Sequence, residues 1–244
     1  MEDSKAPNMK ALCLLIALVV PGRPLAQESA KADSKRQLMN VLQQLQRAPT
    51  PQSDSQKPGW LDPIVQVELK EIVQAFPGTE EAATAQVWLS VCELEASQSR
   101  PFSQRKQKAL AEIAVLDGII KRDPAAWQAK MAHLAKAGSY LTARDYESLS
   151  AHVKAVLPTI ATYRSETNEQ FQAYLTGVGS TADDVEPLLM RMLVIGACEV
   201  GKPEQALKYA KDLQTRFPAW AIRNHIASDI EQLELGGLPY RSRK

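Results

Sequence analysis

Aromatic residues and cysteines are scarce in this chain of 244 residues. Phe, Trp and Tyr together make up 6% of it, and there are three cysteines. β-Sandwich cores draw on aromatic and β-branched residues, and small disulfide-stapled domains need many cysteines, so the composition fits neither class. Cys92 and Cys198 lie in apolar helical stretches, where we expect them to be buried as small apolar side chains. A disulfide between them is the alternative.

Motifs for catalysis, metal binding and phosphate binding are also missing. The three histidines, His133, His152 and His225, fall on three different predicted helices, and no His-Glu-x-x-His or Cys-x-x-Cys motif occurs. No glycine pair is followed by Gly-Lys-Ser/Thr, and there is no Gly-x-Ser-x-Gly. The sequence therefore predicts no metal, no cofactor and no catalytic residue.

No apolar run is long enough to span a membrane. The run Ala11–Val20 has ten residues, whereas a bilayer needs about 20. A basic start precedes it, and a Pro/Gly break that ends in Leu-Ala follows it. This pattern predicts a secretory signal peptide over residues 1–26, and hence a periplasmic or secreted protein.

The cleaved chain has no excess charge. Cleavage after Ala26 or Ala30, and a start at Met1 or Met9, are all compatible with the sequence. Removing residues 1–26 leaves 26 basic and 26 acidic residues. Only the short tail 241–244 is basic, which argues against a nucleic-acid partner because phosphate binding requires a clustered basic surface.

Composition divides the remaining chain into three parts. Residues 27–48 predict an N-terminal helical arm, because its apolar residues recur at helical spacing. The Pro/Ser/Gln-rich stretch 49–59 predicts a linker, and 60–244 a helical domain. The arm is either tethered away from this domain or folded back onto it.

Helical periodicity dominates from Trp60 onward, without strand-like alternation. Short turns between successive helices predict an all-α fold of antiparallel helix hairpins. Thr79, Ser103, Thr142 and Thr181 are the expected N-caps, and Pro77, Pro124 and Pro218 the expected stops. The expected helices are 61–76, 80–98, 103–122, 125–137, 142–157, 160–175, 182–200, 204–217 and 220–235.

The stretch 201–218, GKPEQALKYAKDLQTRFP, predicts the turn and second helix of one hairpin. Gly201 permits a tight turn, and Ala206 is small enough for two helix backbones to approach. Pro218 closes the unit. Two apolar stripes are expected to face each other in this hairpin. They are Met190, Leu193, Val194 and Ala197 before the turn, and Ala206, Ala210 and Leu213 after it.

These residues resemble a tetratricopeptide repeat (TPR). Gly201, Ala206 and Pro218 match that family's glycine, alanine and proline, and Pro124 and Pro158 are one 34-residue repeat apart. In this reading Gly138 is the turn glycine of a second copy. The residues of that copy are Trp127, Met131, Leu134, Gly138, Tyr140 and Ala143.

The resemblance covers about 76–218 and is irregular. Residues 85–116 form a weaker third copy with a long turn, and 76–89 also resemble repeats of bacterial envelope proteins. Lys130 and Glu147 occupy positions where the family has apolar residues. Residues 159–186 fit no unit and are either a degenerate repeat or an inserted long helix. We therefore expect a compact, irregular TPR-like solenoid.

The resemblance implies a protein or peptide partner. In TPR modules the first helix of each pair lines the concave face, which implies a partner-binding role for Arg191, Ile195 and Glu199. Arg191 and Glu199 do lie off the apolar stripe of their helix. The alternative is that both are ordinary solvated charges.

One enzymatic class is similar enough to consider. Some periplasmic murein-cleaving lytic transglycosylases carry helical solenoids and use a single catalytic glutamate. The sequence Arg164-Ser165-Glu166 inverts their usual Glu-Ser order, and no Gly-Leu-Met-Gln-like segment follows. A lone catalytic acid requires burial to raise its pKa, whereas Glu166 lies in a polar run that predicts exposure.

The expected function is thus that of an exported, non-enzymatic scaffold that binds a cell-envelope protein or peptide. A structural subunit of an envelope assembly is the first alternative. An enzyme that acts on the cell wall is the second.

Overall fold

The computed structural model describes residues 29, 32–41 and 63–240, and within them it contains helices and turns but no β-strand. The predicted all-α fold is confirmed for this part of the chain. Two 3-10 turns, η2 (Leu157–Thr159) and η3 (Ala182–Asp184), interrupt the α-helices. The α-helices are α2 (Pro63–Ala75), α3 (Glu80–Ala96), α4 (Phe102–Arg122), α5 (Trp127–Ala143), α6 (Tyr146–Val156), α7 (Ile160–Arg164), α8 (Glu169–Gly177), α9 (Val185–Glu199), α10 (Pro203–Arg216), α11 (Pro218–Arg223) and α12 (Ile226–Glu234).

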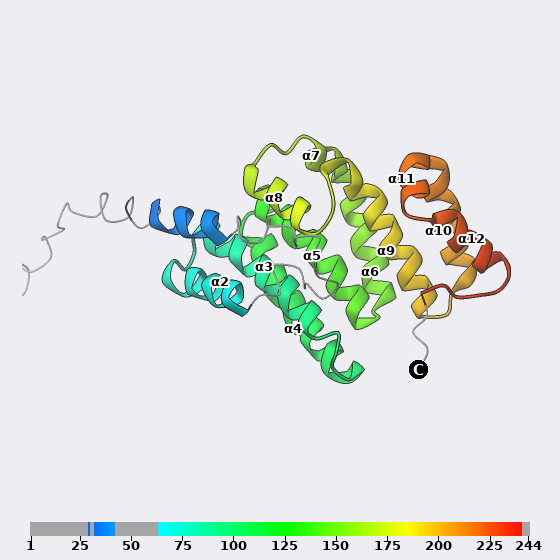
Figure 1. Cartoon of the computed structure of the whole chain (residues 1–244), viewed down its shortest axis with the longest axis horizontal. Coiled ribbons are helices and arrows are strands. Elements are labelled where there is room, and N and C mark those ends of the chain that lie inside the picture. Colours follow the sequence, from blue (N-terminus) through cyan, green and yellow to red (C-terminus); the bar gives the residue numbers. More distant parts are fainter. Residues whose placement is uncertain (1–28, 30–31, 42–62, 241–244) are drawn as a thin grey trace, which may run out of the picture.

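Most helices follow one another along the long axis of the molecule, but α7 and α8 turn back, and α8 lies beside α3 and α5 (Figure 1). Helices α2, α3 and α4 lie at one end, α5, α6 and α9 in the middle, and α10, α11 and α12 at the other end. The closest packing joins neighbours in sequence: α2 with α3, α4 with α5, and α9 with α10. Contacts of α3 with α5 and of α6 with α9 connect these pairs. None of the helices in the described ranges combines the length and the apolar composition that crossing a membrane requires.

Two large apolar clusters make up most of the core of the described residues, and α9 contributes to both. A helix that is apolar on more than one face must be buried on more than one side, and α9 packs against α5 and α6 as well as against α10. One face of α9 contributes Val185, Leu189 and Leu193 to the larger cluster. Another face contributes residues to the smaller, C-terminal cluster: Met190, Val194, Ala197 and Cys198.

The α9–α10 hairpin has its turn at the predicted position, although α9 begins at Val185, three residues later than predicted. Gly201 forms the turn with a φ of +73°, which a residue without a Cβ adopts at no steric cost. Ala206 is fully buried in the smaller cluster together with Ala210 and Leu213. Helix α10 ends at Arg216, and Pro218 begins α11 directly.

The predicted turn at Gly138 is wrong. Helix α5 continues through Gly138 to Ala143, so Thr142 is not an N-cap. The turn lies at Arg144, which has a φ of +54°, and the side chain of Asp145 caps α6 by accepting from the backbone N–H of Ser148 at 3.1 Å. A glycine inside a helix costs about 1 kcal/mol, which the packing of α5 against α3, α4 and α6 outweighs.

Two other predicted helices are divided. Residues 160–175 are not one helix: α7 ends at Arg164, and Asn168 caps α8 by accepting from the N–H groups of Gln170 and Phe171. The prediction that 159–186 could form one inserted long helix is therefore wrong. The predicted helix 220–235 is broken at His225, which has a φ of +56°.

Of the other predicted N-caps, only Thr79 acts as one. Its side chain accepts from the N–H of Ala82 at 3.1 Å. Helix α4 begins before Ser103, with Pro101 at the cap position. Thr181 precedes η3 without a side-chain cap and donates instead to Asp184 Oδ2 at 3.0 Å.

The described part of the N-terminal arm, residues 32–41, is helical and folds back onto the body. Leu38 and Val41 are buried in the larger cluster, which also holds Val65, Leu69 and Ile72 of α2. Burial of these side chains stabilises the docked arrangement over a free tether. The predicted signal peptide, the linker 49–59 and the basic tail 241–244 lie outside the described residues.

Candidate functional site

The three residues predicted to bind a partner lie on α9. Arg191 is half-buried and contacts the C-terminal helices: its Nη1 donates to Asn224 Oδ1 at 2.9 Å, and its Nη2 to the Tyr240 hydroxyl at 3.4 Å. Its guanidinium also lies over the ring of Trp220, 5.9 Å from the centroid. The side chain therefore has a structural role in holding the C-terminal segment on α9.

Glu199 contacts a different part of the molecule. Its Oε2 forms an ion pair with Arg144 Nη2 at 2.9 Å, at the turn that follows α5. Ile195 is half-buried between the other two positions. Neither charge is an ordinary solvated one, because each is engaged within the chain. A partner-binding role for the three residues stays a prediction.

The fold brings two histidines together that the sequence placed on separate helices. The rings of His133 on α5 and His152 on α6 have centroids 5.2 Å apart, and Nε2 of His152 donates to the carbonyl oxygen of His133 at 3.0 Å. The ring of Tyr140 lies 5.7 Å from that of His152. Across the described ranges no group of three or more His, Cys, Asp or Glu side chains is placed to hold a metal.

Both imidazoles favour the neutral form. Burial, with the charges of His152 and Lys136, lowers the pKa of His133 to about 4. Burial also lowers the pKa of His152, more than its hydrogen bond to the His133 carbonyl raises it. A buried imidazole loses solvation when it becomes charged, so this pair is a packed, neutral feature at pH 7.

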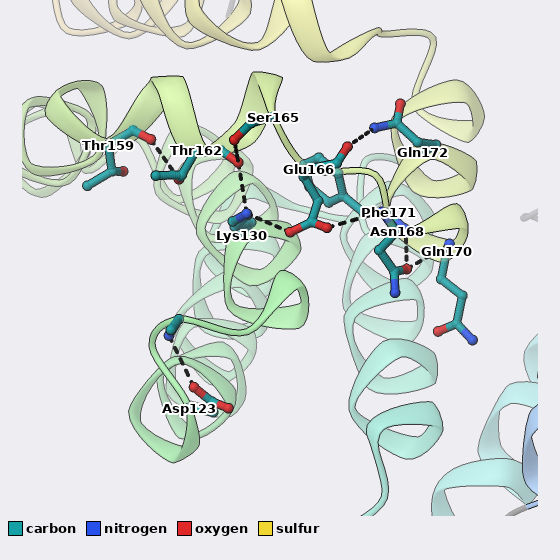
Figure 2. A network of polar contacts seen from close by, with 11 residues as sticks. Asp123, Lys130, Thr159, Thr162, Ser165, Glu166, Asn168, Gln170, Phe171 and Gln172 are labelled. Carbon is teal, nitrogen blue, oxygen red and sulfur yellow. Dashed lines mark hydrogen bonds and ion pairs between the residues drawn. The ribbon is translucent and has the colours of Figure 1, made fainter.

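Glu166 was expected to be exposed, and that expectation is wrong. Its side chain is 18% exposed and pairs with Lys130 Nζ at 2.6 Å. Lys130 also donates to the carbonyl oxygen of Thr162 at 2.8 Å. Figure 2 shows how Glu166 further accepts from the N–H of Asn168, while its carbonyl accepts from the amide of Gln172. This network holds the loop between α7 and α8, and it gives Lys130 polar partners at a position where the resemblance to a tetratricopeptide repeat predicted an apolar residue.

The same contacts decide the protonation of Glu166. Burial alone would raise the pKa of this carboxyl, but the hydrogen bonds from Lys130 and Asn168 and the lysine charge outweigh it and lower the pKa. A general acid for glycoside cleavage needs a raised pKa. The environment of Glu166 is thus the opposite of the one that such a catalytic role requires.

The two cysteines are buried on α3 and α9 and form no disulfide with each other. Burial raises the pKa of the Cys92 thiol to about 12 and that of Cys198 to about 11. Thiols with raised pKa values are poor nucleophiles because the thiolate is the reactive form.

A surface groove beside the α2–α3 turn offers room for a ligand. Its first part, called here the apolar groove, has an empty volume of about 630 Å³ between α2, α3 and the C-terminal half of α4. Small side chains make this space: a glycine on α4 faces alanines on α3. The groove is lined by Val73, Pro77, Gly78, Ala82, Ala83, Gln86, Val115, Gly118, Ile119 and Arg122.

The second part, called here the polar hollow, adjoins the first and shares Gly78, Ala83, Ile119 and Arg122 with it. It has an empty volume of about 640 Å³. The N-terminal ends of α3 and α5 and the C-terminal end of α4 surround it. Its other lining residues are Thr79, Glu80, Asp123, Ala126 and Gln128.

The local sequence explains the shape of the turn at this site. Gly78 has a φ of +84°, which favours glycine. Thr79 both donates to the carbonyl oxygen of Phe76 at 2.9 Å and caps α3. These bonds hold the turn in one conformation at the edge of the groove and the hollow. Sequence reasoning missed the groove because its small residues lie on different helices, although the run of alanines after Thr79 was a local signal.

Comparison with known proteins gave no match: no family model matches the sequence, and no curated protein or solved structure is significantly similar to it.

Proposed function

We propose that this protein is an exported, non-enzymatic, TPR-like scaffold that binds a protein or peptide segment in its apolar groove. The observation that carries the proposal is the groove itself, which lies open between the successive helix pairs α2–α3 and α4–α5. Binding sites of this kind are concave and mostly apolar, with a few polar groups. Val115, which is partly exposed on the groove wall, offers an apolar contact to such a segment.

The helix arrangement supports the architecture in this proposal. Neighbouring helices pair along the long axis, as helical repeat proteins do. The α9–α10 hairpin has the glycine turn and the small crossing residue of the repeat family it resembles. The proposal that the protein is exported rests on the apolar segment near the N-terminus. Mass spectrometry of the protein from its native cell tests it, because a mature chain that begins at residue 27 or 31 is the expected product.

Gly118 provides a sharp test of the groove. It lies within α4, and a Cβ added there meets no heavy atom within 4 Å. The Cβ of Gly118→Leu should therefore be accommodated, and the rest of its side chain should occupy space in the groove that Gly118 lines. Gly138→Leu is the matched control, because Gly138 is also helical, also has open space at its Cβ, and does not line the groove.

The experiment is selection of a displayed random peptide library against the chain, followed by binding titrations with the selected peptides. We expect peptides rich in apolar residues that bind the unmodified chain and the Gly138→Leu chain alike, and bind Gly118→Leu at least tenfold more weakly. Thermal unfolding of each variant checks that it is folded. Peptides that bind all three chains equally would contradict the groove as the binding site.

A second candidate function is that of a structural subunit, and the outer face of α2 favours it. Ile64 and Val67 are 64% and 53% exposed, and their spacing places them on one face of the helix. Exposed apolar ridges mark packing surfaces when they are contiguous. Sedimentation of the chain with and without Val67→Lys tests this: self-association that the substitution abolishes would favour the subunit function.

A further inference from the structure

The last described residues of the chain lie against α9. Gly236, which has a φ of +78°, ends α12, and the chain then turns back towards α9 (Figure 1). Leu238 and Tyr240 pack, partly buried, against the smaller apolar cluster. Residues 238–240 are called here the strap. The strap covers part of α9 at the C-terminal end of the molecule.

The tyrosine of the strap is bound through its hydroxyl group. This hydroxyl donates to Asp229 Oδ2 on α12 and accepts from Arg191 Nη2 on α9 at 3.4 Å. The guanidinium of Arg191 also lies over the Tyr240 ring, 5.9 Å from its centroid, and the backbone of Tyr240 is hydrogen-bonded to the Cys198 thiol. Burial and the bond to Asp229 raise the pKa of Tyr240 to about 12, so the phenol keeps the proton that it donates.

The groups that hold this phenol are themselves held by other parts of the protein. Arg191 Nη1 donates to Asn224 Oδ1 at 2.9 Å, and its guanidinium lies over the Trp220 ring. The amide of Asn224 donates in turn to the carbonyl oxygen of Trp220 at 3.0 Å. None of these contacts involves the strap, so they remain when the strap leaves. The five residues around the phenol are called here the phenol pocket: Arg191, Cys198, Trp220, Asn224 and Asp229.

Few contacts hold the strap in place. Within the described part of the chain, no backbone–backbone hydrogen bond joins residues 238–240 to the rest. The side-chain hydrogen bonds of the strap are those of the Tyr240 hydroxyl, and Leu235 just before it is 82% exposed. Segments with few buried contacts open locally at low cost. The phenol pocket is therefore accessible whenever the strap detaches.

The chemistry of the pocket indicates recognition more than packing. Apolar contacts would hold a chain end as well, because replacing both partners of a buried hydrogen bond by apolar groups is nearly neutral for stability. Asp229, which is 9% exposed, and Arg191 instead accept from and donate to one group. A neutral phenol satisfies both. Phenylalanine satisfies neither, and phosphotyrosine would bring negative charge against Asp229.

We propose that the phenol pocket is a docking site for another protein that presents an extended Leu-x-Tyr segment, and that the strap is the autoinhibitory occupant of this site. The incoming tyrosine replaces Tyr240 and the incoming leucine replaces Leu238. A second copy of the chain is a poorer occupant, because each strap already fills its own pocket and an exchange would add no contact. This site goes beyond the scaffold function, since it lies at the opposite end of the molecule from the apolar groove (Figure 1).

The test uses the full chain with Tyr240→Ala, which removes the phenol of the strap from the pocket. The probe is the peptide acetyl-Gly-Gly-Leu-Pro-Tyr-amide, which has the sequence of residues 236–240, and ligand-observed NMR measures its binding at pH 7. We expect it to bind Tyr240→Ala at least tenfold more tightly than the unmodified chain, where the tethered strap competes at an effective concentration in the millimolar range. Peptides with phenylalanine or phosphotyrosine in place of tyrosine should bind at least tenfold more weakly.

Further variants separate the pocket from general effects. Arg191→Gln added to Tyr240→Ala should weaken peptide binding on the order of tenfold, because it removes a charged hydrogen-bond partner. Leu235→Ala is the matched control next to the strap, and it should bind the peptide as weakly as the unmodified chain. Thermal unfolding checks that each variant is folded. If Tyr240→Ala does not fold, Tyr240→Phe keeps the ring without the hydroxyl and should bind the peptide more tightly than the unmodified chain.

Three results would overturn the proposal. The first is no binding of the tyrosine peptide to a folded Tyr240 variant up to about 5 mM, a very weak affinity, which would make the strap a packed chain end only. The second is equal binding of the tyrosine and phenylalanine peptides. The third is dimerisation of the unmodified chain that Tyr240→Ala abolishes, which would assign the pocket to the strap of a second copy. Gly118→Leu should change none of these measurements, so this proposal and the apolar groove fail separately.

Discussion

Replacing Gly177 with alanine should destabilise the protein, whereas replacing Gly118 with alanine should stabilise it. Gly177 ends α8 directly against the indole of Trp88. A Cβ at this position would lie 2.4 Å from Cη2 and 3.1 Å from Cζ2 of Trp88. The indole cannot move away easily, because Trp88 is fully buried and packs edge-on against Tyr174 with ring centroids 5.2 Å apart. At Gly118 an added Cβ meets nothing within 4 Å.

The expected magnitudes follow from two opposing effects. Alanine in place of glycine favours a helix by up to about 1 kcal/mol, and this is the whole effect at Gly118. At Gly177 the added methyl group overpacks a closed core, which typically costs about 1–3 kcal/mol and sometimes more. A domain of this size changes its melting temperature by about 2–4 °C per kcal/mol. We therefore expect Gly177→Ala to lower the melting temperature by about 2–10 °C, and Gly118→Ala to raise it by about 1–4 °C.

Thermal unfolding followed by circular dichroism measures both shifts under identical conditions. A double-mutant cycle with Trp88→Leu then identifies the cause, because removing the indole should make Gly177→Ala nearly neutral and give a coupling of about 1 kcal/mol or more. If Gly177→Ala stabilises the chain as Gly118→Ala does, or if the cycle shows no coupling, α8 does not pack on Trp88 and the reasoning is refuted.

Three further predictions concern other parts of the core. Ala206→Trp should destabilise the chain by about 1–3 kcal/mol or more in urea unfolding, because it overpacks the α9–α10 crossing; an unchanged midpoint would contradict the hairpin register. Burial lowers the pKa of His133 to about 4 from 6.5, so the stability that neutral His133 contributes is complete above pH 6.5 and should fall by up to about 3 kcal/mol as the pH drops from 6.5 towards 4. Urea midpoints across that range should show this slope, and His133→Phe should reduce it and leave the part that His152 contributes, because the pKa of His152 is also lowered. Glu186→Gln should cost about 1–3 kcal/mol, because the buried carboxylate accepts from both Arg164, at 2.8 Å, and Arg216; equal urea midpoints for the two chains would show that the pairs contribute nothing.

Features determined by a single helix or a single turn could be predicted from the sequence. The stripes around Gly201 have the spacing that a buried helix face requires, and the turn of the hairpin lies at the predicted glycine. Thr79 was identified as a cap from its position before an acidic first turn. In these cases the local preference and the tertiary packing favour the same structure.

Predictions failed where packing outweighed a local signal. Gly138 indicated a turn, but the neighbours of α5 hold it in a helix. The break between α7 and α8 depends on Lys130, more than 30 residues away, which pairs with Glu166. Residues 160–175 do contain one local signal for the break, the N-cap Asn168, but the pairing with Lys130 cannot be predicted from them.

The candidate site was hidden for a related reason. The apolar groove exists because Ala83 on α3 and Gly118 on α4 leave space opposite each other, and the sequence alone does not give their pairing.

The position of α9 between the two apolar clusters also has a consequence for how the molecule opens. The fully buried apolar side chains of α10, α11 and α12 belong to the smaller cluster, whereas those of α9 are divided between the two clusters. The C-terminal helices can therefore detach as one cooperative unit while α9 keeps its contacts with α5 and α6. Backbone amides of α10 and α12 should then exchange with solvent through this partial opening, and those of α9 only when the whole chain unfolds.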